Sequence, residues 1–247
     1  MADTSFGGLS FDSLGIVVER VYDFLSDFND DMEDKSGDDG SIYRCVYIPS
    51  REIRLECRAF EDTWADFDAL IDTLMVAFLS DREERQLRVR TRPGTYYMAH
   101  FSDYDEGDRE GGVGIGAFTL TFVASDPHRY SDSERTANIP SGGSVTFAVG
   151  GTVPCFPKVQ SSVAIRNSTS KLWGVKLDNA VRMRVSPSVT SRKAVSIDCA
   201  SRAVTIDNAT SMITLESDWF EMPPGEHTVT MDEGTGAATI TWRERWL

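Results

Sequence analysis

Residues 61–81, EDTWADFDALIDTLMVAFLSD, form the one stretch of the chain with a helical period, while the segments on either side have the pattern of strands and loops. Apolar side chains recur here at spacings of three and four: Trp64, Phe67, Ile71, Leu74 and Phe78. The pattern predicts a helix over 63–79, capped by Asp62 or Thr63, with Asp66 near its positive end. Such an aromatic face must pack on a sheet.

The segment before the helix, residues 42–60, predicts two strands paired as a hairpin centred on Arg51. One face would hold Tyr43, Cys45, Tyr47, Ile53, Leu55, Cys57 and Ala59. The other face would be exposed or meet a partner through Arg44, Arg54, Glu56 and Arg58. This hairpin would set Cys45 opposite Cys57. Cytoplasmic thiols are usually kept reduced, which favours two small strand residues over a disulfide.

The segment 23–41 is rich in Asp and Gly and lacks any period, so it predicts a long loop or arm. Alternate acidic spacing at Asp27, Asn29 and Asp31 is superficially that of a calcium loop. Met32, however, stands where an EF-hand requires glycine, and no Glu closes the loop. A solvated arm is the favoured interpretation.

The rest of the first half predicts further strands and turns. Short strands are expected over 5–11 and 16–21, a hairpin over 87–91 and 96–101, a polar loop over 102–112 and a strand over 113–124. Pro93-Gly94 suits the tight turn of that hairpin. The glycine-rich GGVGIG at 111–116 precedes a strand pattern, so no helix end is available there to hold a phosphate.

A polar stretch with a proline, SDPHRYSDSERT at 125–136, marks a boundary between domains over 1–130 and 131–247. Short strands follow at roughly ten-residue spacing. The candidates are 144–149, 158–166, 173–177, 183–185, 195–199, 204–207, 219–222, 227–231 and 238–246. The predicted fold is mainly β: an N-terminal β-sandwich-like domain with one helix and hairpins, and a C-terminal jelly-roll β-sandwich.

The formal net charge of −14 lies entirely in residues 1–130, while residues 131–247 are balanced. An acidic chain is a poor nucleic-acid binder, because binding requires basic groups that displace counterions from phosphates. An acidic wall would suit a channel through which DNA slides, although plain solvation also explains the charge. The N-terminus lacks a secretory pattern and no apolar run is long enough to span a membrane, so we expect folding in a cytoplasm.

The search for chemistry predicts no catalytic, cofactor or metal site. The chain contains no G-x-x-x-x-G-K-[ST], G-x-S-x-G or H-E-x-x-H motif. His100, His128 and His227 have no ligand-type neighbours at metal spacing, and the four cysteines lack zinc spacing. Carbohydrate binding is an alternative, with Trp173 and Trp219 as candidates for stacking on sugar rings. Core packing is the commoner role of such side chains.

Several phrases resemble the phage distal tail protein family in the same order along nearly the full length. These are SFGGLSFDSLGIVVE, SGDDGSIYRCVYIPSREIRLECRAF, the helix at 61–81, the strand at 96–99, GGTVPCFPKVQ, VSIDCASRAVTID, SDWFEMPPGEHTVT and TITWRERWL. Gly7 departs from the asparagine usual in the opening turn. The most specific phrase is LTFVASDPHRY, where Asp126, Pro127 and Tyr130 match the interdomain junction.

This resemblance implies a structural, non-enzymatic virion protein at the tail tip, with a galectin-like C-terminal domain. It implies a homohexameric ring that joins the tail tube to the hub and receptor-binding machinery and lets DNA pass without specific binding. The C-terminal domains would serve as docking platforms or bind host glycans. For the ring contacts we expect the 42–60 hairpin and the 23–41 arm, including Asp30 and Asp31. The alternatives are a carbohydrate-binding protein, another tail component such as the tube protein, and a glycan hydrolase.

Overall fold

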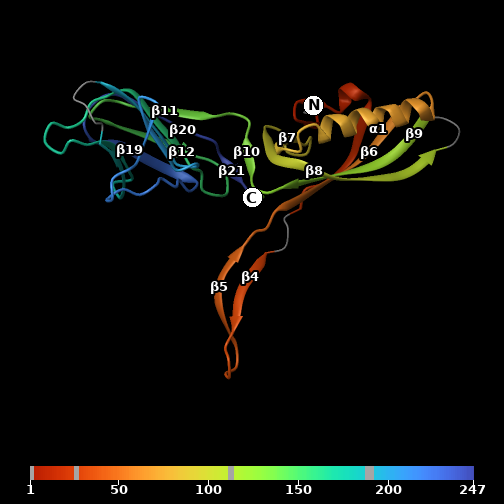
Figure 1. Ribbon diagram of the computed structural model, residues 1–247, viewed down its shortest axis with the longest axis horizontal. Helices are drawn as coiled ribbons and strands as arrows, with labels where there is room; N and C mark the ends of the chain where they lie inside the picture. The colour runs from red at the N-terminus through yellow and green to blue at the C-terminus, as the bar shows by residue number, and fades with distance from the viewer. Residues whose placement is uncertain (1–2, 25–27, 111–113, 187–191) are drawn as a thin grey trace. The chain divides into compact units, whose positions relative to one another are not determined.

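The computed structural model describes residues 3–24, 28–110, 114–186 and 192–247 (Figure 1). The chain divides into two compact units, Met1–Arg129 with Leu247 (unit 1) and Tyr130–Trp246 (unit 2). Strands dominate both, and α1 (Trp64–Leu79) is the one α-helix in the described ranges, so the predicted mainly β fold with one helix is confirmed. Within these ranges, no helix is long and apolar enough to cross a membrane.

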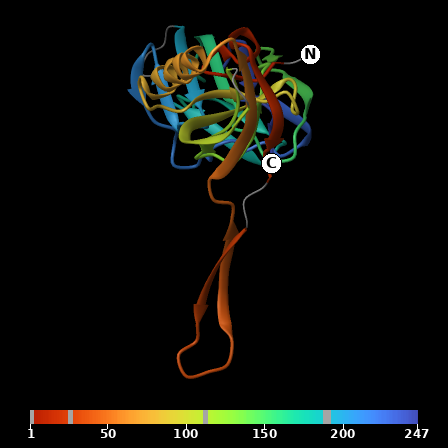
Figure 2. The same cartoon turned by 90° about the vertical axis from the view of Figure 1, so that its right-hand side faces the viewer.

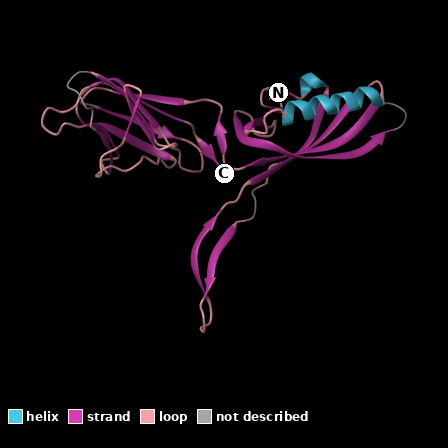
Figure 3. Ribbon diagram, viewed as in Figure 1, coloured by secondary structure: helices cyan, strands magenta, loops and turns pink. Residues whose placement is uncertain are grey.

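Seven strands of unit 1 form an antiparallel sheet in the order β2-β1-β7-β8-β9-β6-β3. Figure 3 draws the strands in magenta and the helix in cyan. The seven strands are β1 (Ser5–Phe6), β2 (Leu9–Ser10), β3 (Ile16–Tyr22), β6 (Arg51–Glu61), β7 (Arg85–Arg88), β8 (Thr95–Glu110) and β9 (Gly114–Ala124), with a short 3-10 turn over Asp12–Leu14. Side chains alternate across the strands, so β6 and β9 each bury every second residue on one face. That face forms the core of unit 1.

The helix covers this buried face as predicted. The side chain of its N-cap residue, Thr63, accepts a hydrogen bond from the backbone N–H of Asp66 at 3.2 Å. Phe67, Leu74 and Phe78 are buried against the sheet. A Cβ at position 116 would lie 2.7 Å from the ring of Phe67, so the glycine there lets the helix approach closely. Burying each such apolar side chain stabilises the fold by roughly 1.5–3 kcal/mol.

The two predicted turns of unit 1 are present. β7 and β8 pair across a turn in which Gly94 has φ +77°, and the N–H of Thr95 donates to the carbonyl of Arg92 at 3.3 Å. β1 and β2 pair around Gly7 and Gly8, whose φ values of +59° and +88° favour glycine. The strand predicted over 113–124 is β9.

The predicted hairpin over 42–60 is wrong. β5 (Ser41–Tyr47) pairs with β4 (Asn29–Asp34), whereas β6 pairs with β3 and β9. The segment 23–41 therefore contains a strand and a turn rather than only a loop. Cys45 is exposed and Cys57 is buried, both with free thiols, so they do not face each other. The physical reason is burial: every residue of β5 is exposed, whereas β3, β6 and β9 bury alternate side chains on one shared face.

A second correction concerns the polar stretch 102–112, which was predicted to be a loop. β8 continues through it to Glu110 and pairs with β9, for example at Asp103 opposite Thr121 and Asp105 opposite Thr119. The side chains here are largely exposed, so pairing with β9 rather than burial holds this half of the strand. Residues 111–113 lie outside the described residues.

Unit 2 is a β-sandwich, as predicted. Its first sheet has the order β11-β20-β13-β16-β17-β18 and its second has the order β12-β19-β14-β15. The strands are β11 (Arg135–Ile139), β12 (Ser144–Val149), β13 (Lys158–Ala164), β14 (Trp173–Leu177), β15 (Val181–Val185), β16 (Lys193–Asp198), β17 (Ala203–Ile206), β18 (Ala209–Ser211), β19 (Gly225–Glu233) and β20 (Ala238–Trp242). β10 (Arg129–Ser131) pairs with β21 (Arg245–Trp246).

Most predicted strands of unit 2 are present, with three differences. Residues 219–222 form no strand but only a bridge between Met222 and Cys155, because Phe220 and Met222 enter the core from a loop. The strand predicted over 238–246 is interrupted after Trp242. The strands β11 and β18 were missed; both lie at the edges of the six-stranded sheet, where few of their side chains are buried.

Candidate functional site: the assembly surfaces

The uncovered face of the unit 1 sheet, which we call the open face, is built from charged and polar side chains. Arg54, Glu56 and Arg58 project there from β6, opposite the buried side chains of the same strand. Nε of Arg58 lies 2.9 Å from Oε1 of Glu19, and its other side pairs with Glu110. These contacts raise the pKa of Arg58 above its ordinary value, and the hydrogen bond to Glu110 has the largest effect. The charged groups therefore tie β3, β6 and β8 together.

The strand register extends this face into transverse rows. Arg54 lies beside Tyr22 on β3 and Thr121 on β9, and Thr121 lies beside Asp103 on β8. In the next row, Glu56 accepts a hydrogen bond from the phenol of Tyr22 at 2.9 Å. The charged residues of the open face are Glu19, Arg20, Glu52, Arg54, Glu56, Arg58, Asp103, Asp105 and Glu110. Six are acidic and three basic, so the face carries a net charge of −3.

The open face is formed by β8, β9, β6 and β3, and this group of strands has two different edges. β3 pairs with β6 on one side only. At the opposite end β7 meets β8 only over 97–99, whereas β9 pairs with β8 from His100 to Glu110. Among the strands β1 to β9, none pairs with the outer side of β8 over 103–110. Unpaired edges of this kind are templates for pairing with another chain.

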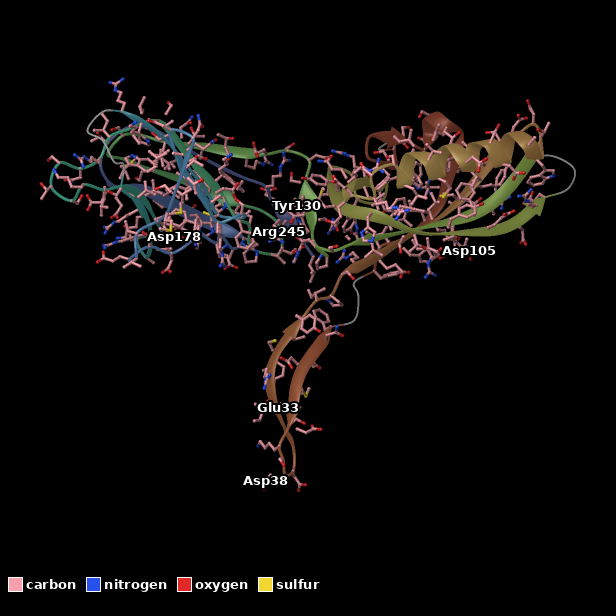
Figure 4. All side chains as sticks on the ribbon, in the orientation of Figure 1. Glu33, Asp38, Asp105, Tyr130, Asp178 and Arg245 are labelled. Atoms are coloured by element: carbon pink, nitrogen blue, oxygen red, sulfur yellow. The ribbon has the colours of Figure 1, made fainter. Side chains whose placement is uncertain are left out.

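The β4–β5 ribbon, which we call the arm, is a two-stranded sheet inserted between β3 and β6 (Figure 2). Its side chains are largely exposed, and Figure 4 labels Glu33 and Asp38 along it. The predicted interface residues Asp30, Asp31 and Arg44 are on the arm, and Arg44 pairs with Glu33. Arg54, Glu56 and Arg58 belong instead to the open face, so the structure divides the predicted set between two surfaces.

A polar cluster, in which Arg51 and Tyr97 are buried and Arg92 is exposed, joins the two points where the chain enters and leaves the arm. Asp23, which follows β3, accepts hydrogen bonds from Nε of Arg92 at 3.0 Å and from the phenol of Tyr97 at 3.2 Å. Arg51, at the start of β6, donates to the Tyr97 oxygen at 3.0 Å. Burial raises the pKa of Tyr97, and burial together with the nearby cations Arg92 and Arg51 lowers that of Arg129.

Sequence reasoning missed this cluster, although a signal was available. Arg51 is 2% exposed and stands in phase with Ile53, Leu55 and Cys57, the buried positions of β6. The alternation that predicted those three residues to be buried therefore extends to Arg51. Its charge led to the opposite expectation of a surface turn.

Unit 2 offers a shallow groove of about 430 Å³ on its six-stranded sheet. A row of uncharged polar side chains crosses every strand of that sheet at one register: Asn138, Thr239, Gln160, Ser196, Thr205 and Thr210. Four of them line the groove, which contains no charged side chain among its lining residues. Hydroxyl and amide groups both donate and accept hydrogen bonds. Their chemistry is suited to a neutral, hydroxyl-rich ligand.

Of the two tryptophans named as candidates for stacking on sugars, Trp173 is fully buried in the core of unit 2, so it has the core role that was favoured and cannot stack on a ligand. Trp219 is half-buried and packs against the same core. In the sequence, an aromatic residue in a predicted strand is compatible with both sugar stacking and core packing, and only its burial in the structure distinguishes the two roles. In the described part of the chain, no group of three or more His, Cys, Asp or Glu side chains could hold a metal ion.

The predicted junction residues lie near the division between the units. Asp126 accepts a hydrogen bond from the backbone N–H of His128 at 3.1 Å and also contacts its ring, and Pro127 is buried. The ring of Tyr130 lies 5.4 Å from the guanidinium carbon of Arg245 within unit 2. Figure 4 labels both residues. The interdomain role of these residues remains a proposal.

Comparisons with known proteins agree with both units. A model of the phage tail protein RIFT-related domain matches residues 13–124, and a model of the siphovirus-type tail component, C-terminal domain, matches residues 150–246. Together they cover most of the chain. No curated protein gave a significant sequence match.

Two solved structures share the fold. The crystal structure of SPP1 Dit, described as a paradigm of hub adsorption apparatus in phages infecting Gram-positive hosts, aligns with a TM-score of 0.80. It is 18% identical and the alignment covers 99% of each chain. A chain of the phage P2 baseplate in its activated conformation with Ca aligns with a TM-score of 0.50 at 9% identity, covering 99% of this chain and 98% of that one.

Proposed function

The chain belongs to the siphovirus-type tail component family of phage distal tail proteins, and we propose that six copies form a ring joining the tail tube to the hub. The ring would lie at the tail tip, its lumen would let DNA pass, and assembly would take place in the host cytoplasm. The role is structural rather than enzymatic. Tube protein, hub and receptor-binding protein are the expected partners.

The two unlike edges of the unit 1 sheet carry this proposal. A ring closes through heterologous contacts, in which one patch of each copy binds a different patch of the next. β3 of one copy would pair with the 103–110 half of β8 in its neighbour. Repetition of this pairing would extend the four strands β3, β6, β9 and β8 into a closed barrel, which removes both exposed edges.

The open face would line the lumen of that barrel. Its net charge of −3 per copy repels phosphate, so DNA would slide without being retained. Arg54, Glu56 and Arg58 would then act at the lumen and its subunit boundaries. The proposal therefore keeps these residues at an assembly surface while moving the ring contacts from the arm to the sheet edges.

A proline on the β8 edge tests the ring. Asp108 lies in the bulge between Glu106 and Arg109, where the register gives it no partner on β9, so Asp108→Pro removes a backbone N–H from this half of β8 without breaking a β9 pair. We expect wild-type protein to form six-fold rings in negative-stain electron microscopy and hexamers in native mass spectrometry. Asp108→Pro should give folded monomers, and Asp108→Ala should retain rings. Rings of unchanged abundance with the proline would contradict edge pairing.

The groove of unit 2 supports a second candidate function, the binding of a neutral host-surface glycan. The row of Asn, Gln, Ser and Thr side chains across the whole sheet favours it. A glycan array with the wild-type protein and with Gln160→Ala tests it. Binding that the variant loses would support the function, and an array without binding would remove it.

A further inference from the structure

The arm exposes more apolar surface than a free ribbon can stabilise. Six large apolar side chains are each between 47% and 58% exposed: Phe28, Met32, Ile42, Tyr43, Val46 and Tyr47. A two-stranded hairpin alone is at best marginally stable in water, and contiguous exposed apolar surface usually marks an interaction site. These side chains therefore need a partner that covers them.

The register of the arm places this apolar surface on both of its faces. The pairing shifts by one residue between Asp31, which lies opposite Cys45, and Met32, which lies opposite Tyr43, so Arg44 stands in a bulge. Successive residues of β4 face opposite sides of the ribbon, so one face holds Tyr47, Cys45 and Ile42 and the other holds Val46, Tyr43 and Met32. Each face of the arm thus mixes apolar and acidic groups across the two strands.

The charge of the arm identifies the kind of partner. Residues 28–47 carry six acidic and two basic side chains, a net charge of −4, and one of the two cations, Arg44, is already paired with Glu33. Two arms from neighbouring copies would bring like charges together, which disfavours a contact between arms. A complementary surface is apolar at its centre and basic at its rim.

We propose that the arm docks into an apolar groove rimmed by arginine or lysine on a different tail protein, and not onto a second copy of this chain. The inference rests on the proposed role as a tail ring that adjoins other rings. It assigns the sheet edges to contacts between copies and the arm to contacts with a neighbouring ring. The cluster of Asp23, Arg92, Tyr97 and Arg51 would hold the base of the arm in place for this contact.

Cys45 provides the probe. It is exposed on the arm, on the same face as Tyr47 and Ile42, whereas the other three cysteines are buried. Burial raises the pKa of Cys57 to about 12, of Cys155 to about 11 and of Cys199 to about 12, so these thiols are poor nucleophiles near neutral pH. A benzophenone maleimide will therefore label the full chain at Cys45 alone.

The labelled full chain is irradiated alone, with purified tail tube protein of the same phage, and with its purified hub protein. We expect an adduct with the tube or the hub protein, joined through a peptide that contains Lys or Arg, and no adduct between two copies. An adduct between copies, or no adduct with either protein, would overturn the proposal. Electron microscopy of the same samples scores rings separately, so a failure of docking is distinguishable from a failure of ring formation.

Charge reversal sharpens the test. Asp30→Lys with Asp31→Lys leaves the opposed Met32 and Tyr43 in place, and should lower the adduct yield roughly tenfold or more while rings persist. The matched control, Glu221→Lys with Glu226→Lys, makes the same charge change at exposed positions of unit 2 and should leave the yield unchanged. Equal yields from the two variants would show that the acidic groups of the arm play no part in docking.

Discussion

Arg51 donates a hydrogen bond to the phenol oxygen of Tyr97 at 3.0 Å, and both side chains are at most 2% exposed. Tyr97 in turn donates to Asp23, so one hydroxyl joins the residue after β3 to the first residue of β6. These are the two points at which the chain leaves and re-enters the sheet around the arm. A cation, a phenol and a carboxylate thus set the base of the arm.

Tyr97→Phe should destabilise unit 1 by about 1–3 kcal/mol, because it removes the hydrogen bond that the buried Arg51 donates to the phenol and one of the two hydrogen bonds that Asp23 accepts. The free energy of unfolding from urea titration measures the loss. Tyr47→Phe removes the same hydroxyl from an exposed position of the arm and should change stability by less than about 0.5 kcal/mol. Equal effects would mean that the cluster contributes nothing beyond packing.

Phe67→Ala should cost about 3–5 kcal/mol, because it opens a cavity between α1 and the sheet. The Phe67 ring is fully buried, with its centroid 6.1 Å from that of Phe118. Phe60, on the open face, is 55% exposed, and Phe60→Ala should change the free energy of unfolding by less than about 0.5 kcal/mol. A large loss with Phe60→Ala would contradict the assignment of the two faces in the isolated protein.

How far the sequence predicts this fold depends on the range of each interaction. The helix was predictable because its cap, Thr63, and its apolar face are local patterns. The partner of β5 was not, because NDDMED in β4 has no apolar alternation and strand pairing is a long-range property. The polar half of β8 was not predicted to be a strand for the same reason: its side chains are largely exposed, and its pairing with β9 is not visible in the sequence. The candidate ring surfaces are sheet edges, so they could not be predicted before the strand order was known.

Asp178 should make unit 2 less stable in acid. Burial of its carboxyl acts to raise the pKa, but hydrogen bonds from the N–H of Thr228 at 2.7 Å and from His227 at 2.6 Å outweigh it, so the pKa is lowered. A lowered folded pKa gives stability that is present above the unfolded value of roughly 3.9 and is lost as pH falls through the folded value.

The melting temperature of Asp178→Asn against pH measures this contribution. The variant should melt below wild type at neutral pH, and the gap should narrow as the pH falls below about 4 and through the lowered folded pKa, at which the wild-type carboxylate becomes protonated. Asp38→Asn, at the tip of the arm, makes the same change without a buried partner and should match wild type throughout. A gap that stays constant down to pH 2 would contradict a role for the ionised carboxylate.

The acidic open face gives the last prediction, which concerns DNA. Asp103 and Asp105 project from β8 beside Thr121 and Thr119, and Figure 4 labels Asp105. Asp103→Lys with Asp105→Lys changes the net charge of the open face from −3 to +1 per copy, so a ring lumen that repelled phosphate would attract it. Purified variant rings should retain linear DNA in a filter-binding assay at low salt, and the retention should fall steeply as salt rises, because each phosphate contact releases counterions. Wild-type rings should retain none.

The control variant, Glu221→Lys with Glu226→Lys, adds the same charge to unit 2. If those rings retained DNA as well as the lumen variant, charge anywhere on the protein would suffice, and the open face would have no special relation to the DNA path.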